Sequence, residues 1–130
     1  MSVTDSSSCC ACSGPTALVF PCSGSSNVGQ LANALGLYLS QEGIAKMSCL
    51  AGVGAHLGGF VASARDCERL IVIDGCPLRC AAKLFEHVAI EPKHYILLTE
   101  HGFRKQAGVL PSADELERAK TFVNDLLQEH

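Results

Sequence analysis

The sequence predicts an α/β fold: a three-layer, open, mostly parallel four-stranded sheet of the flavodoxin-like or Rossmann-like kind. Four short apolar runs recur along the chain, and turns rich in Gly, Ser or Pro follow the first three. Segments with apolar residues at helical spacing separate the runs. Strand, loop and helix repeated four times is typical of a parallel sheet covered by helices on both faces.

Length and composition indicate one domain. The chain has 130 residues, of which 48% are hydrophobic, so we expect a single domain over residues 15–130 after a flexible, Ser- and Cys-rich tail at residues 1–14. No apolar run approaches the roughly 18 residues that cross a bilayer, so no membrane segment is expected. The first eight residues lack the basic and apolar regions of a secretory signal peptide, which indicates a cytoplasmic protein. A net charge of -3 without a Lys/Arg cluster argues against a nucleic-acid partner.

The first unit begins with an apolar run over residues 16–20 that ends at Pro21 and predicts a buried strand. A loop of small residues follows. Asn27 is expected to cap the next helix, with Gln30 as its capping-box partner, and Gly43 to end it. Apolar residues at helical spacing support this helix: Val28, Leu31, Leu35 and Tyr38.

The second unit is predicted as a strand over residues 46–50 and a glycine-rich turn over residues 51–54. One helix of mostly small residues should then run from about Ala55 to Cys67. This unit lacks strong capping signals, so its prediction rests on composition and spacing.

The third unit contains a continuous β-branched run over residues 70–74, which predicts a strand. Pro77 suits the first position of the following helix. Asp74 is expected to cap or orient the loop around Cys76 through backbone N–H groups. The helix should pass through Leu84, Phe85 and Val88.

The fourth unit consists of a predicted strand over residues 94–99 and a final helix. Ser112 and Glu115 form a capping box at the start of that helix. Its apolar stripe comprises Leu116, Phe122, Val123 and Leu126.

The chain has eight cysteines, and the expected compartment decides their role. Disulfides are rare in the cytosol, so thiolate chemistry or metal binding is the better interpretation. Cys22 lies two residues after the first predicted strand, Cys49 near the end of the second, and Cys76 two residues after the third. Cys80 is expected on the same helix face as Cys76. Cys67 falls in a helical stretch and equally fits a small buried apolar residue.

These positions predict a metal site at one edge of the sheet. Ligands of parallel sheets bind beyond the carboxyl ends of the strands, and the thiols of Cys22, Cys49, Cys76 and Cys80 should meet there. Sulfurs on one zinc ion lie roughly 3.8 Å apart and strands about 4.8 Å apart, so loop side chains can close the gap. If the first strand lies between the other two, Cys22 is central. Helix N-termini after Cys22 and Cys76 favour thiolates.

Three segments carry a resemblance to a known family: residues 21–32, 49–54 and 73–80. They resemble the DGC-motif family of proteins proposed to bind zinc, which is named for an Asp-Gly-Cys motif, here Asp74-Gly75-Cys76. The resemblance spans about residues 16–110. It implies a small domain in which four cysteines hold zinc, matching Cys22, Cys49, Cys76 and Cys80, and it implies no established reaction.

Several alternatives remain open. The chain could be a thiol redox or metallothiol enzyme that uses Cys22 or Cys76. It could instead carry or sense a metal, with a docking arm formed by Cys9, Cys10 and Cys12. A low-molecular-weight phosphatase loop is disfavoured because such chemistry needs an Arg six residues after the nucleophile, where this chain has Val28.

The sequence offers no clear catalytic pair and two histidines near the predicted cysteine edge. No acid–base pair stands out, so the catalytic residues are unknown and no reaction is predicted. His56 and His101 fall just past predicted strands and could add a metal ligand, although a single loop histidine is more often solvated.

Charge is unevenly distributed along the chain. Before Arg65 the charged residues are Asp5, Glu42 and Lys46, and the other 20 of the 23 lie from Arg65 onward. Helices that cover a sheet normally carry charge on their outer faces. The segments 28–40 and 55–64 carry none, so we expect a homodimer with these two helices in its interface.

Overall fold

The computed structural model describes residues 16–128 and contains four parallel strands in the order β3-β2-β4-β5. The strands are β2 (Ala17–Pro21), β3 (Lys46–Met47), β4 (Arg69–Asp74) and β5 (His94–Leu97). The predicted α/β class is therefore confirmed. In chain order the strands lie second, first, third and fourth, which is the flavodoxin-like order. The first strand is central, as the metal-site prediction required.

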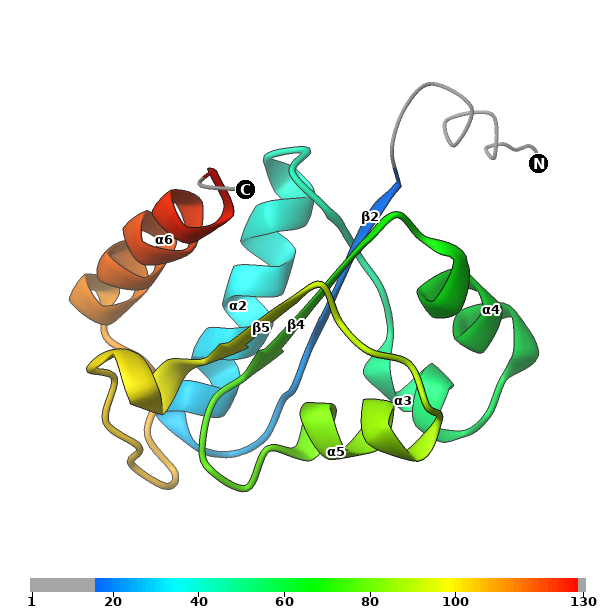
Figure 1. Cartoon of the computed structure of the whole chain (residues 1–130). Coiled ribbons are helices and arrows are strands. Elements are labelled where there is room, and N and C mark those ends of the chain that lie inside the picture. Colours follow the sequence, from blue (N-terminus) through cyan, green and yellow to red (C-terminus); the bar gives the residue numbers. More distant parts are fainter. Residues whose placement is uncertain (1–15, 129–130) are drawn as a thin grey trace.

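Helices cover both faces of the sheet (Figure 1). α2 (Asn27–Gln41) and α6 (Ala113–Gln128) lie on one face. On the other face lie α3 (Leu50–Gly54), α4 (Gly58–Asp66) and α5 (Cys80–His87). A short 3-10 helix, η2 (Leu98–His101), follows β5. None of the helices in the described part of the chain combines the length and apolar character that a membrane crossing needs.

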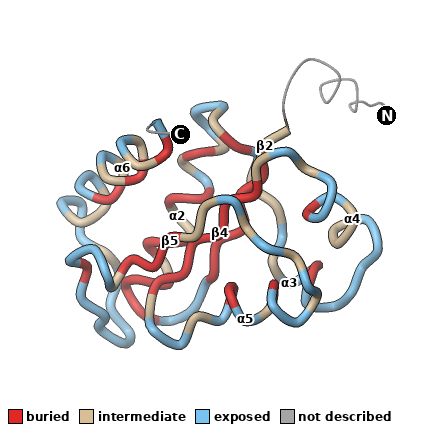
Figure 2. Tube along the Cα trace, in the orientation of Figure 1, coloured by how far each residue is buried: buried red, intermediate tan, exposed pale blue. Residues whose placement is uncertain are grey.

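The hydrophobic core lies around the two central strands, β2 and β4 (Figure 2). Their continuous apolar runs are buried because helices cover both sheet faces. The rings of Phe20 in β2 and Phe85 in α5 meet edge to face, with centroids 5.2 Å apart. On the opposite face, α2 buries Leu31, Leu35 and Leu39 completely.

The single helix expected from Ala55 to Cys67 is wrong. The glycine-rich segment before it is already helical as α3, and the chain then turns before α4 begins. His56 adopts a left-handed backbone conformation with φ 58°, and the Leu57 amide donates to the Gly52 carbonyl at 3.0 Å. This is a Schellman turn with His instead of Gly, and it ends α3 without the usual sequence signal.

Two helix starts also differ from the prediction. Ser26, not Asn27, caps α2, and its hydroxyl accepts a hydrogen bond from the Gly29 amide at 3.0 Å. α5 begins at Cys80 rather than near Pro77, because Arg79 is in the left-handed region (φ 55°) and interrupts the helical backbone. Cys76 therefore lies in a turn and does not share a helix face with Cys80.

Other helix ends follow the sequence closely. Gly43, with φ 74°, ends α2, and the Ile44 amide donates to the Leu39 carbonyl at 2.9 Å. The predicted capping box of α6 is present: the Ser112 amide donates to the Glu115 carboxylate at 2.8 Å, and the Glu115 amide donates to the Ser112 hydroxyl at 3.0 Å.

Two strands are shorter than predicted. β3 ends at Met47, so Cys49 and Leu50 already belong to the start of α3. β5 ends at Leu97 and continues as η2. The predicted tail at residues 1–14 lies outside the described residues.

Candidate functional site

Cysteines follow three neighbouring strands at the carboxyl edge of the sheet. Cys22 comes directly after β2, Cys49 two residues after β3, and Cys76 two residues after β4. Cys80 is the first residue of α5. The loop after β2 leads to α2 on one face, whereas the loop after β4 leads to α5 on the other (Figure 1). Adjacent connections that diverge in this way create the crevice where open α/β sheets bind ligands.

Cys22 and the loop that carries Cys76 are in direct contact. The Cys22 amide donates to the Ile73 carbonyl at 2.9 Å, and the Gly75 amide donates to the Cys22 sulfur at 3.2 Å. A β-carbon at Gly75 would lie 2.5 Å from the Val28 carbonyl oxygen, so only glycine lets the loop pass this close to α2. The glycine of the Asp-Gly-Cys motif therefore brings Cys22 and Cys76 together.

Cys22 is a buried thiol with a strongly raised pKa. Burial raises the pKa of Cys22 to about 12, and the nearby Asp74 carboxylate and Cys76 add to the rise. The Gly75 amide acts in the opposite direction but is outweighed. The expectation that the following helix N-terminus favours a Cys22 thiolate is therefore wrong, because desolvation dominates.

Asp74 ties the Cys76 loop to the start of α5. Its side chain is 1% exposed and accepts hydrogen bonds from the amides of Ala81 and Ala82, each at 2.9 Å. The Tyr95 hydroxyl donates to the same carboxylate at 2.8 Å. Asp74 does act through backbone N–H groups, as predicted, but these groups belong to the first turn of α5 rather than to the Cys76 loop itself.

A third group of residues reaches the site from the far end of the chain. The Lys105 ammonium donates to the Cys76 sulfur at 3.4 Å. We call residues 104–108 the strap, because this segment crosses the β2–α2 loop. The Asn27 amide donates to the Gln106 carbonyl at 3.1 Å, and the Gly108 amide donates to the Ser25 carbonyl at 2.9 Å. The strap thus places a positive charge beside Cys76.

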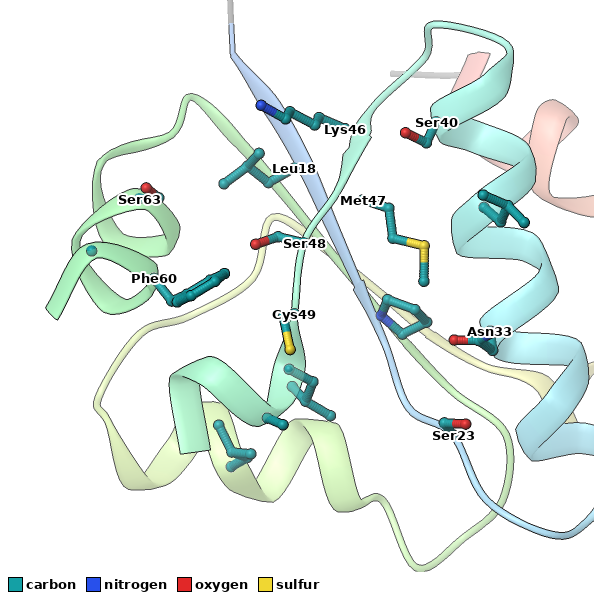
Figure 3. A pocket seen from close by; sticks show the side chains of 16 residues that line it. Leu18, Ser23, Asn33, Ser40, Lys46, Met47, Ser48, Cys49, Phe60 and Ser63 are labelled. Carbon is teal, nitrogen blue, oxygen red and sulfur yellow. The ribbon is translucent and has the colours of Figure 1, made fainter. Parts of the chain in front are cut away.

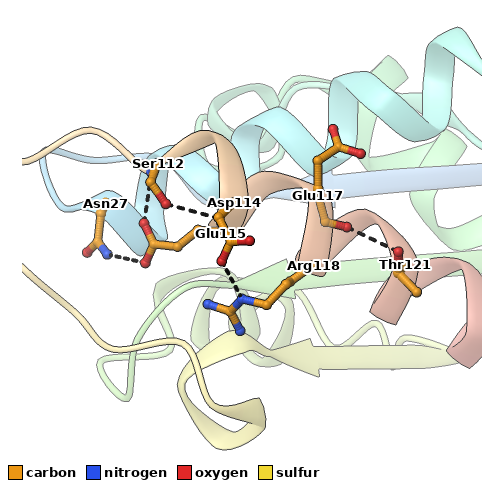
Figure 4. Close-up of polar contacts among 7 residues, drawn as sticks. All are labelled: Asn27, Ser112, Asp114, Glu115, Glu117, Arg118 and Thr121. Atoms are coloured by element: carbon orange, nitrogen blue, oxygen red, sulfur yellow. Dashed lines mark hydrogen bonds and ion pairs between the residues drawn. The ribbon is translucent and has the colours of Figure 1, made fainter.

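Asn27 holds the strap and the start of α6 together. Its side-chain oxygen accepts from the Gln106 amide at 2.6 Å, and its side-chain nitrogen donates to the Arg104 carbonyl at 2.8 Å. The same nitrogen donates to Glu115 at 3.2 Å, which is the carboxylate that caps α6 (Figure 4). The sequence presented Asn27 as a helix cap, so its contacts over about 80 positions of the chain went unrecognised, and neither it nor Lys105 was among the predicted site residues.

The four predicted ligands are not gathered around one point. Cys49 and Cys80 are exposed, whereas Cys22 is buried and Cys76 half-buried. Within residues 16–128, no group of three or more Cys, His, Asp or Glu side chains could hold a metal ion as it stands. Soft thiol donors at one edge suit zinc chemically, but among the four only Cys22 is hydrogen-bonded to a loop that carries another of them, Cys76. The metal assignment stays a prediction.

The remaining candidate residues lie elsewhere. The ring of His56 faces His87, with centroids 5.2 Å apart, and His101 stacks on Phe122 at 4.4 Å. Cys67 is half-buried at the end of α4, and its thiol donates to the Ala64 carbonyl at 3.4 Å. Cys9, Cys10 and Cys12 lie outside the described residues.

The fold and the cysteine edge define a small α/β domain built around an Asp-Gly-Cys loop. The chain belongs to the DGC domain family, whose model matches residues 18–123 and confirms the resemblance. It is similar to the "Anaerobic and virulence modulator AnvM" of Pseudomonas aeruginosa, with 41% identity over 113 residues, which are 87% of this chain and 86% of that protein. No solved structure matches the chain.

Proposed function

We propose that this chain is a cytoplasmic regulatory module that binds a zinc ion reversibly through thiols at the carboxyl edge of its sheet. The observation that carries the proposal is the contact between Cys22 and the Cys76 loop at the divergence of two connections. Cys49 and Cys80 stand at the same edge and supply the remaining sulfur donors.

The residues of the site have distinct roles in this proposal. Zinc would supply the positive charge that stabilises thiolates. Cys22, whose pKa is raised by burial, gives up its proton on binding, so binding should release protons and strengthen as the pH rises. Cys76 provides a second sulfur beside the Lys105 ammonium. Cys49 and Cys80 are exposed at the starts of α3 and α5, so they can join without disrupting the core.

A reversible role is favoured over a permanent structural one. Structural zinc sites are closed, with four protein ligands in place. Here the hydrophobic core is built from the strands and helices, and among the described residues only part of the proposed thiol set is arranged side by side. The relative from Pseudomonas aeruginosa is named a modulator, and a regulatory role for this chain agrees with that name.

Metal content tests the proposal directly. Protein purified without added metal and then equilibrated with zinc should hold about one zinc per chain by elemental analysis. The Cys22→Ser, Cys49→Ser and Cys76→Ser variants should each lose most of it, whereas the matched control Cys67→Ser should keep it. Stoichiometric zinc in the Cys76→Ser protein would contradict the assignment.

The contact between Cys22 and the Cys76 loop also supports a redox function as a second candidate. Oxidation of the two thiols to a disulfide would release two protons and two electrons, which a hydroperoxide would accept to become an alcohol and water. In metal-free protein, a hydroperoxide should then produce a Cys22–Cys76 disulfide, detected by mass spectrometry after proteolysis. Because burial raises the pKa of Cys22, Cys76 is the thiol expected to react first, and if Cys76 reacts no faster than free cysteine near pH 7, redox chemistry loses its support.

A further inference from the structure

An apolar groove lies beside the edge strand β3, and Cys49, one of the proposed zinc ligands, is among the residues that line it (Figure 3). Its volume is about 1210 Å³, and Leu18, Met47 and Phe60 are among its apolar lining. α2 forms one wall with Asn33 and Leu37, and α4 contributes to the opposite wall. Of the described residues that line the groove, Lys46 alone is charged.

Leu37 stands exposed at the wall of this groove. Its side chain is 49% exposed, whereas Leu39 two residues later is completely buried in the core. An exposed leucine that borders an apolar groove marks a surface suited to contact with another molecule.

The surrounding surface is electrically neutral. Between residues 16 and 64 the sequence contains one negative residue, Glu42, and one positive residue, Lys46. The outer positions of α2 are Gln, Asn, Ala, Leu, Tyr or Ser, and those of α4 up to Ser63 are Gly, Phe, Val, Ala or Ser. Helices that cover a sheet normally carry charge there. By contrast, α6, which lies on the same sheet face as α2, carries many charged residues.

We infer that a second copy of this chain covers this face through a two-fold axis, with Leu37 of each copy seated in the groove of the other. A two-fold axis sets one patch against its own copy, so charges of one sign on the patch meet their equals. A patch with one positive and one negative residue avoids this repulsion. It also contains both the ridge formed by α2 and the groove that receives it, so its shape complements itself.

The contact is expected to use side chains rather than strand pairing. β3 has only two residues and carries Lys46, and short strands with an exposed lysine resist edge-to-edge association. The inference rests on the shape and charge of the face formed by β3, α2 and α4 rather than on zinc, although Cys49 at the edge of the groove is also a proposed zinc ligand.

Size-exclusion chromatography with multi-angle light scattering tests the inference on the full chain at micromolar concentration. We expect a mass about twice the 13.7 kDa of one chain. Leu37→Glu should shift the mass to that of the monomer. Urea unfolding of that monomer should still have a clear midpoint, which shows that the variant is folded. The matched control Leu110→Glu changes a leucine that is 78% exposed and outside the groove, and it should leave the dimer intact.

The outcomes separate this inference from the zinc proposal. A monomeric wild-type chain, or a Leu37→Glu protein that stays dimeric, overturns the two-fold contact. Zinc content is measured on the same samples. A monomeric Leu37→Glu protein that still binds zinc supports both proposals, whereas a dimer without zinc supports the contact and contradicts the metal site.

Discussion

Asp74 shows how one residue shapes the cysteine edge. Its carboxylate is buried and satisfied by two helix amides and the Tyr95 hydroxyl. The guanidinium of Arg79 lies 5.3 Å above the Tyr95 ring, and its Nε donates to the same hydroxyl at 3.4 Å. Burial raises the pKa of Tyr95, so this hydroxyl keeps its proton and remains a donor. Asp74 thereby fixes the turn that holds Cys76.

Replacing Asp74 by Asn should destabilise the domain by about 2–3 kcal/mol, the range typical of lost hydrogen bonds to a buried charged group. An amide of the same shape keeps one acceptor but turns an N–H group toward a helix amide. Urea unfolding measures the loss. The control Asp66→Asn removes an exposed carboxylate paired with Arg65 and should change stability by less than about 0.5 kcal/mol. Equal effects of the two substitutions would contradict the positioning role of Asp74.

At the scale of elements, the strap couples the last third of the chain to the first loop. An antiparallel bridge joins Ser26 and Ala107, and Asn27 is bonded to the strap at Arg104 and Gln106, just before that bridge. The same Asn27 reaches the capping carboxylate of α6. α2, the strap and α6 therefore form one connected unit that borders the Cys76 sulfur.

Asn27→Ala should loosen the strap because it removes three side-chain hydrogen bonds at once. We expect amide hydrogen exchange at Gln106 and Gly108 to rise by about tenfold or more, which corresponds to about 1.4 kcal/mol. The matched control is Asn124→Ala, which removes a bond from α6 to the Tyr38 hydroxyl of α2 without touching the strap. If both variants speed exchange in the strap equally, Asn27 has no special role there.

At the scale of the whole molecule, the hydrophobic core of the described residues extends from β2 to α6. The core is built from β2 onward, and the family match begins at residue 18. Residues 1–14 carry few apolar side chains, among them Met1 and Val3, so they offer little surface to bury.

A chain that begins at Pro15 should therefore unfold at the same urea concentration as the full chain and bind the same amount of zinc. Replacing Cys9, Cys10 and Cys12 together by Ser in the full chain is the matched control, because it removes the thiols and keeps the length. Loss of zinc in both proteins would mean that the tail supplies a ligand. Loss of stability in the shortened chain alone would mean that the tail packs on the domain.

The sequence predicted those features that depend on residues close together along the chain. Residues within a few positions of each other determine the four apolar runs, the stop at Gly43 and the Ser112–Glu115 capping box. The contacts of Asp74 with the start of α5 reach seven and eight positions along the chain. The sequence did not predict the interruptions of helical backbone at His56 and Arg79. Both residues have left-handed backbone, but neither is a glycine, which is the residue that usually marks such a position.

The sequence by itself determined the α/β class, the family and the position of cysteines at one sheet edge, since these follow from periodicity and from motif spacing. Only the tertiary structure decided that burial raises the pKa of Cys22 to about 12, that Lys105 stands beside Cys76, and that Leu37 faces a groove while Leu39 fills the core. Burial and contacts between residues dozens of positions apart arise from packing, and spacing along the chain does not encode them.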